Sequence, residues 1–171
     1  MKKLFVVALI VMVLCMTKEN SSSLVIIPND AIRLRVIASS NKVKDQQIKY
    51  KVANDLKQDL SKLLQSSNSI NETRKILKTN MDFFADTINK TVNNDDYDIN
   101  YGINHFPKKV YKGVIYPEGD YESLVVTLGN GLGKNFWCVL FPPLCLLEGE
   151  ENNQKDVEYK FFVKELINKY F

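Results

Sequence analysis

Residues 31–64, AIRLRVIASSNKVKDQQIKYKVANDLKQDLSKLL, change from one hydrophobic period to another, and this change indicates the kind of fold. In residues 31–38, large aliphatic residues alternate with two arginines, a period of two that is typical of a half-buried β-strand. From Val43 to Leu64 the apolar residues recur at helical spacing, with lysines and aspartates on the other face. Residues 39–41 (SSN) supply turn and N-cap chemistry between the two. A strand followed by a long amphipathic helix is therefore predicted.

A second helix is predicted after a break at residues 66–69. Ser69 and Glu72 match the capping box, in which the serine oxygen and the glutamate carboxylate each accept a hydrogen bond from a backbone N–H at the helix start. The residues expected on its buried face are Ile76, Leu77, Met81, Phe84, Ala85, Ile88 and Val92. Residues 93–96 (NNDD) end this helix.

Two or three further strands follow the helices. Residues 97–105 and 122–128 alternate in polarity, and the turn-rich connection 106–120 has room for a short strand near 110–116. Neighbouring strands of this kind pair most simply in the antiparallel direction, with both helices on one face of the sheet. We therefore predict an α+β fold of two layers: a small, mostly antiparallel sheet of three or four strands covered by two helices, with an extra C-terminal helix.

The end of the chain is expected to form that extra helix. Residues 148–156 (EGEENNQKD) are polar and have the composition of a linker, which leaves residues 24–147 as one α+β domain. In residues 157–171, one helical face carries Tyr159, Phe162, Val163, Leu166, Ile167 and Tyr170. We expect this amphipathic helix to dock on the domain or on a partner. Binding to a membrane surface is a weaker alternative, because two glutamates dilute the lysines of its polar face.

Residues 1–23 have the layout of a secretory signal peptide. Two lysines follow the first methionine, residues 4–16 (LFVVALIVMVLCM) are an uninterrupted apolar run, and residues 17–23 are polar. Thirteen helical residues reach about 20 Å, which is short of the roughly 30 Å hydrocarbon core of a bilayer. The main alternative is an uncleaved N-terminal anchor. Both interpretations predict that the domain is exported.

The composition excludes several classes of function. The chain has 23 basic and 20 acidic residues and a net charge of +3, and much of the excess lies in its first twenty residues. The remainder is too close to neutral for a nucleic-acid-binding surface. With one histidine, His105, and no spacing of a metal site or a phosphate loop, we expect neither a metal nor a cofactor. The acidic residues at 118, 120 and 122 are expected to form a solvated rim.

Cys138 and Cys145 lie seven positions apart in the exported part, whereas Cys15 lies within the apolar run. In an oxidising compartment a disulfide between the first two would persist and would stabilise the fold by about 2–3 kcal/mol. Two free buried thiols are the alternative. A free thiol also allows a different class of function, an extracytoplasmic thiol enzyme that uses Cys138 or Cys145 with His105. Against this enzyme, His105 ends a predicted strand and is expected at the surface or at an edge.

Residues 135–147 (NFWCVLFPPLCLL) are unusually apolar. Two consecutive prolines remove backbone donors, so a central strand cannot continue through them. We predict an ordered loop, held by a cross-link, that presents aromatic rings to a partner. The alternative is that these rings fill the core beneath a loop. The candidate partner-binding residues are Asn135, Phe136, Trp137, Phe141, Pro142 and Pro143.

Three segments together resemble one known family. They are IRLRVIASSN at 32–41, FPKKVY at 106–111 and PEGDYESLVVTLGNGLGKNFWCVLFPPLC at 117–145. This combination is similar to the stage II sporulation protein R family, over most of the exported chain. Phe136 stands where the family usually has tryptophan, an exchange that keeps stacking area but loses an N–H donor. The tail from Glu148 onward has no counterpart in this resemblance.

The resemblance implies a secreted signalling protein of sporulation. Such proteins are made in the forespore of endospore-forming bacteria and are exported into the space between the two membranes. There they activate a membrane-embedded aspartic protease, which removes the pro-sequence of the sigma-E precursor. The expected partner is this protease, membrane contact is expected only through the N-terminal segment or the protease, and the chain itself is expected not to be an enzyme. A cell-wall or small-ligand binding module is the least favoured alternative.

Overall fold

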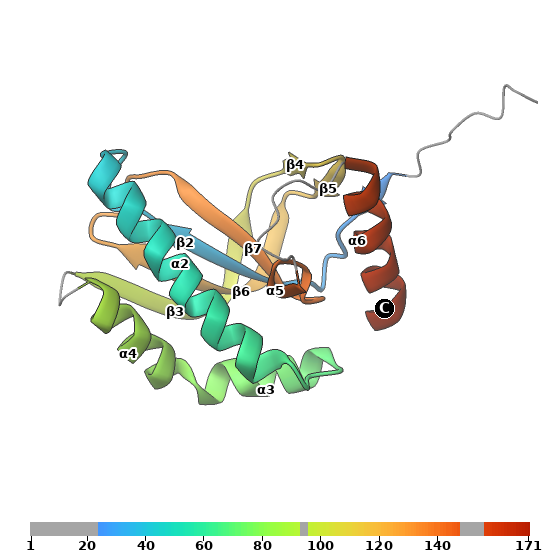
Figure 1. The fold of residues 1–171 in the computed structure, drawn as a ribbon, viewed down its shortest axis with the longest axis horizontal. Coiled ribbons are helices and arrows are strands. Elements are labelled where there is room, and N and C mark those ends of the chain that lie inside the picture. Colours follow the sequence, from blue (N-terminus) through green and yellow to red (C-terminus); the bar gives the residue numbers. More distant parts are fainter. Residues whose placement is uncertain (1–23, 93–95, 148–155) are drawn as a thin grey trace, which may run out of the picture.

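The computed structural model describes residues 24–92, 96–147 and 156–171 and confirms the α+β class (Figure 1). The larger sheet has four strands in the order β3-β6-β2-β7. Their bounds are Tyr97–Phe106 for β3, Gly119–Leu128 for β6, Ile32–Ile37 for β2 and Asn135–Phe141 for β7. The smaller sheet has the order β1-β5-β4, with β1 at Val25–Ile26, β5 at Val114–Tyr116 and β4 at Lys109–Tyr111. The predicted signal peptide or anchor lies outside the described residues, as does the predicted linker except for its last residue.

Pairing in the larger sheet is mostly antiparallel, as predicted. β3 pairs with β6 and β2 pairs with β7 in the antiparallel direction, whereas β2 and β6 are parallel, with Leu34 opposite Leu124. A parallel pair needs a long crossover connection, and the helices lie between these two strands in the chain. Leu34 and Val36 belong to the core beneath the helices, so the alternation of β2 places Arg33 and Arg35 on the opposite face.

Helices α2, α3 and α4 lie on one side of the larger sheet (Figure 1). Their bounds are Val43–Leu64 for α2, Ile70–Thr79 for α3 and Met81–Val92 for α4. The first predicted helix is confirmed at both ends, but the prediction of one continuous second helix was wrong at Asn80. The Asn80 side-chain amide donates to the Ile76 carbonyl at 2.7 Å, and its backbone leaves the helical region at φ −113° and ψ 19°. An asparagine that bonds to nearby backbone competes with helical hydrogen bonds.

The start of α3 confirms most of the predicted capping box. Ser69 Oγ accepts a hydrogen bond from the Glu72 backbone N–H at 3.3 Å. The Glu72 carboxylate accepts from the backbone N–H of Asn68 at 2.9 Å, one residue before the position that the capping box specifies. Two backbone donors are therefore satisfied at this helix end.

Replacing Ser69 by alanine is expected to lower the free energy of unfolding by about 1 kcal/mol, because the Glu72 N–H loses its acceptor. Urea denaturation of the two proteins measures the difference. Ser66→Ala, at an exposed position shortly before the helix, is the matched control and is expected to cost less. Equal losses in the two variants would contradict a specific role for the cap.

The described residues form two hydrophobic cores. The main core lies between the helices and the larger sheet, and it includes Leu56, Leu77 and Phe84, which are fully buried. The second core lies between the smaller sheet and α6, which spans Asp156–Tyr170. Tyr159 and Val163 of α6 are buried there. The predicted C-terminal helix is thus confirmed, and it docks on the domain.

Candidate functional site

Residues 135–141 form the edge strand β7, so the prediction of a loop over this segment was wrong. Cys138 and Leu140 face the main core, and Val139, on the other face, is also buried. A strand that is buried on both faces shows no alternation of apolar and polar residues, so the sequence pattern did not identify β7 as a strand. The prolines act as expected, because the strand ends at Phe141, and a cis peptide bond follows between Phe141 and Pro142.

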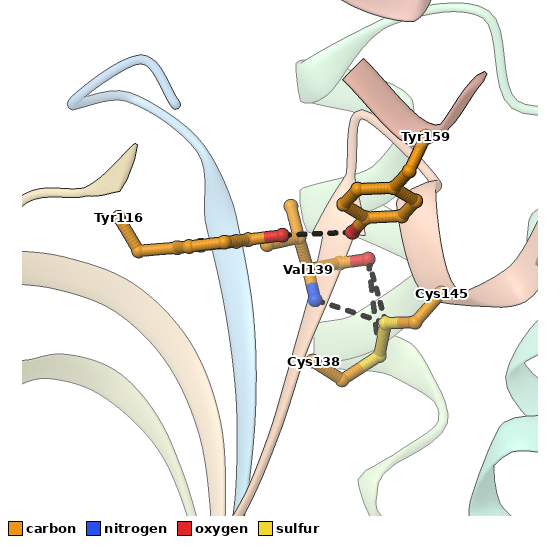
Figure 2. The surroundings of a disulfide bond; sticks show 5 residues. All are labelled: Tyr116, Cys138, Val139, Cys145 and Tyr159. Atoms are coloured by element: carbon orange, nitrogen blue, oxygen red, sulfur yellow. Dashed lines mark hydrogen bonds between the residues drawn. A yellow bond between two sulfur atoms is a disulfide. The ribbon is translucent and has the colours of Figure 1, made fainter. Parts of the chain in front are cut away.

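A disulfide joins Cys138 of β7 to Cys145 of the short helix α5, Leu144–Leu147 (Figure 2). The two Cα atoms are 5.8 Å apart, which is within the usual range for a disulfide. The backbone N–H of Val139 donates to the Cys145 sulfur at 3.0 Å. Of the two alternatives, a bridge or free thiols, the structure shows the bridge. It ties α5 to β7 and indicates an extracytoplasmic location.

Among the residues that the structure describes, no helix is long and apolar enough to cross a membrane.

A cavity of about 570 Å³ lies beside β7. β7 contributes Asn135, Phe136 and Trp137 to the lining, and α2, the β4–β5 hairpin and α6 contribute other walls. The further lining residues that carry a ring or a positive charge are Arg33, Tyr50, Lys57, Phe106, Lys109, Tyr111, Tyr116 and Tyr159. The hydroxyls of Tyr116 and Tyr159 lie 2.9 Å apart (Figure 2). The cavity wall is therefore aromatic and basic.

The candidate partner-binding residues divide into two groups. Asn135, Phe136 and Trp137 are partly exposed and line the cavity. Phe141 and Pro142 are buried, with Phe141 only 2% exposed, and Pro143 is partly buried. Neither Phe141 nor Pro142 lines the cavity, and the Phe141 ring packs against the rings of Tyr170 and Phe171. The structure therefore brings only the first three together at the cavity.

Trp137 is held by neighbours from distant parts of the chain. Its ring centre lies 5.2 Å from that of Phe106, and the Arg35 guanidinium carbon lies 4.9 Å from the ring centre. Arg35 Nε also donates to Asn135 Oδ1 at 3.3 Å. These contacts fix an aromatic ring and a cation at the cavity wall before any partner binds.

Arg33 is a cavity residue that the sequence pattern missed. It is 3% exposed, although the alternation of its strand predicted a solvent-facing position. Its guanidinium carbon lies 3.4 Å from the Tyr121 ring centre and 5.2 Å from the Phe106 ring centre. Burial lowers the pKa of Arg33, because desolvation disfavours the charged form. No pattern within residues 31–38 could reveal this burial, because the covering rings come from β3 and β6.

His105 lies far from the disulfide. It is exposed on β3, as expected for a surface or edge residue, with Nδ1 3.0 Å from Asp120 Oδ1. β3 and β7 are the two outer strands of the larger sheet, and three inter-strand spacings separate them by about 14 Å. The sulfurs of Cys138 and Cys145 are also bonded to each other in the disulfide. The structure therefore does not assemble the Cys–His pair that the thiol-enzyme alternative requires.

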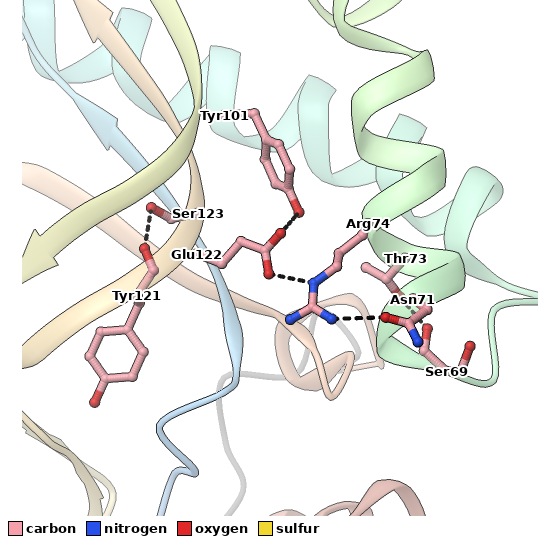
Figure 3. A network of polar contacts seen from close by, with 8 residues as sticks. All are labelled: Ser69, Asn71, Thr73, Arg74, Tyr101, Tyr121, Glu122 and Ser123. Carbon is pink, nitrogen blue, oxygen red and sulfur yellow. Dashed lines mark hydrogen bonds and ion pairs between the residues drawn. The ribbon is translucent and has the colours of Figure 1, made fainter.

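Glu122 belongs to a structural network and not to a solvated rim (Figure 3). Its carboxylate accepts from Arg74 Nε at 2.6 Å and from the Tyr101 hydroxyl at 2.7 Å. Burial, together with the hydrogen bond to this carboxylate, raises the pKa of Tyr101. Arg74 also donates to Asn71 Oδ1 at 2.9 Å, so the network ties α3 to the sheet.

Within the described part of the chain, no group of three or more His, Cys, Asp or Glu residues could hold a metal ion.

These features define an α+β domain with a disulfide at one sheet edge and an aromatic, basic cavity beside it. The chain belongs to the stage II sporulation protein R family, whose model matches residues 28–151. It is 35% identical over 135 residues to a relative described as stage II sporulation protein R from Bacillus subtilis (strain 168). This alignment covers 77% of the present chain and 60% of the relative's length. No solved structure matches the chain.

Proposed function

We propose that this protein is a secreted intercompartmental signal of sporulation, which activates a membrane-embedded aspartic protease that processes the sigma-E precursor. The observation that carries the proposal is membership of the stage II sporulation protein R family over residues 28–151. The disulfide supports export, since such bonds persist outside the cytoplasm. In this proposal the chain breaks no bond itself, and the catalytic aspartates belong to the protease.

The cavity beside β7 is the surface that we assign to the protease. A signal of this kind can activate its receptor only by binding the active conformation more tightly than the inactive one. Partly exposed aromatic side chains on a rigid strand are suited to this, because little conformational freedom is lost on binding. Asn135, Phe136 and Trp137 provide such a wall, whereas Phe141, Pro142 and Pro143 do not line the cavity. Contact with the membrane is assigned only to the N-terminal segment or to the protease.

Reconstitution tests the proposal. The full chain, the candidate protease and the sigma-E precursor are expressed together, and cleavage of the precursor is followed by immunoblot. Cleavage is expected only when all three are present, and an aspartate-to-asparagine change in the active site of the protease is expected to abolish it. Equal cleavage without the chain would contradict the proposal, as would cleavage of the precursor by the purified chain alone.

A further inference from the structure

Arg33 carries a buried charge, and two of its three guanidinium nitrogens have no hydrogen-bond partner among the described residues. Among the described residues, no acceptor lies within hydrogen-bond distance of its Nε or Nη2. These two nitrogens lie on the same edge of the planar guanidinium, and together they form a fork that matches the two oxygens of a carboxylate. Burial of a charged group without such partners is costly, so this arrangement calls for an explanation.

The surroundings of Arg33 leave one direction for a partner. The rings of Tyr121 and Phe106 lie near its guanidinium, and such cation–π contacts offset part of the desolvation cost. Ring contacts do not satisfy the N–H groups in the guanidinium plane. Arg33 is part of the cavity lining but its Nε and Nη2 are covered in this conformation, so an oxygen acceptor reaches them from the cavity when the covering side chains move aside.

The charge of the cavity selects an anion. Its described lining includes Arg33, Lys57 and Lys109 but no aspartate or glutamate. The Lys109 ammonium lies 5.8 Å from the Trp137 ring centre, at the same wall. An entering carboxylate therefore meets positive charge and polarisable rings, and no acidic side chain among the described residues. A basic or neutral group would leave the fork of Arg33 without an acceptor.

The edge of β7 favours a polypeptide over a free anion. The Val139 N–H points to the Cys145 sulfur, away from β2, and the alternation of a strand points the backbone groups of Asn135 and Trp137 the same way. No strand within the described residues pairs with this outer edge. Extended segments bind to such edges through their backbone, with alternate side chains entering neighbouring pockets.

We propose that the cavity binds an extended, acidic segment of the partner protein, with one aspartate or glutamate carboxylate on the Nε–Nη2 fork of Arg33. The proposal rests on the proposed function, since it names the chemistry that the protease would present at the same surface. It assigns to Arg33 the recognition of charge and to the edge of β7 the recognition of extended backbone.

A randomised pool of octapeptides, passed over the immobilised full chain, tests this proposal. We expect the retained peptides to be enriched in aspartate or glutamate at one position, and this enrichment to be lost with Arg33→Met and weakened with Arg33→Lys, which keeps the charge but loses the fork. A retained peptide is then compared with a variant in which glutamine replaces its acidic residue. Each is titrated into the full chain, and binding is followed by the fluorescence of Trp137, the one tryptophan of the chain. The glutamine form is expected to bind roughly 10-fold to 100-fold more weakly.

Thermal denaturation separates a binding role of Arg33 from a structural one. Arg33→Met removes a buried cation whose Nε and Nη2 have no described hydrogen-bond partner, so its melting temperature is expected to equal or exceed that of the wild type. Arg74→Met is the matched control, because Arg74 is already paired with Glu122 at 2.6 Å. It is expected to lower the melting temperature and to keep the acidic enrichment.

Two outcomes would overturn the inference: retained peptides without acidic preference, or an acidic preference that survives Arg33→Met. The pool experiment contains no protease, so the two proposals can fail separately. If the precursor is cleaved only with the chain but no acidic preference is found, the inference fails and the proposed function stands. If acidic peptides bind through Arg33 but cleavage does not need the chain, the binding site stands and the proposed function fails.

Discussion

Replacing Trp137 by alanine is expected to reduce cleavage of the sigma-E precursor by roughly 30-fold or more in the reconstituted system, at equal amounts of protein. Trp137 is partly exposed at the cavity, and its ring contacts the Phe106 ring and the Arg35 guanidinium. Large aromatic residues at the centre of a preorganised surface dominate binding energies, and the alanine variant leaves both neighbours without their contact. Quantitative immunoblotting of precursor and product measures the effect.

Three controls accompany this prediction. Trp137→Phe keeps a ring at the cavity and is expected to retain most of the activity. His105→Ala and Phe161→Ala change exposed residues that do not line the cavity, and both are expected to process the precursor normally. Melting temperatures of all variants show whether the fold is kept. Normal cleavage with Trp137→Ala would contradict the assignment of this surface to the protease.

The sequence best predicts the helices and strands that have one buried and one exposed face, because their apolar residues then recur at a regular period. α2 has one buried face and one solvated face, so its period of 3.6 residues predicts both of its ends. The alternation of β2 also predicts a strand, because Leu34 and Val36 lie beneath the helices while Arg33 and Arg35 lie on the opposite face. Local chemistry is informative in the same way at Ser69, where the cap is formed within four residues.

Elements that depend on distant contacts were not predictable in this way. β1 has only two residues and exists through its parallel pairing with β5. β7 is covered on both faces, so its apolar run is equally compatible with a core loop. The break at Asn80 depends on a side chain that bonds to the backbone of Ile76, and a helical period continues across it unchanged. In each case the missing information lies in the tertiary structure.

The candidate site, like the fold, was only partly predictable from the sequence. The composition of residues 135–147 identified Phe136 and Trp137 as candidate binding residues, because aromatic residues beside prolines and a cysteine are unusual in any part of a fold. It also included Phe141, which the structure buries against Tyr170 with ring centres 5.2 Å apart. Arg33 could not be found, since a strand pattern does not show which side chains of β3 and β6 will cover it.

Replacing Cys138 and Cys145 together by serine is expected to lower the free energy of unfolding by about 2–3 kcal/mol and the melting temperature by roughly 5–10 °C. The bridge closes a short loop, with a sequence separation of seven, and holds α5 against β7. Both cysteines also line the cavity, so its wall loosens when the bond is lost. Cleavage of the precursor is therefore expected to fall together with stability, as thermal denaturation and immunoblotting would measure.

The single variants test whether these effects come from the bond. Cys138→Ser and Cys145→Ser each remove the same disulfide, so each is expected to lose nearly as much stability as the double variant. Reductant is expected to destabilise the wild type by a similar amount and to leave all three variants unchanged. Independent, additive losses in the single variants would instead indicate two separate thiols. Alkylation of Cys138 and Cys145 in the wild type without reductant would lead to the same conclusion, and it would remove the covalent support of the cavity from the account of partner binding.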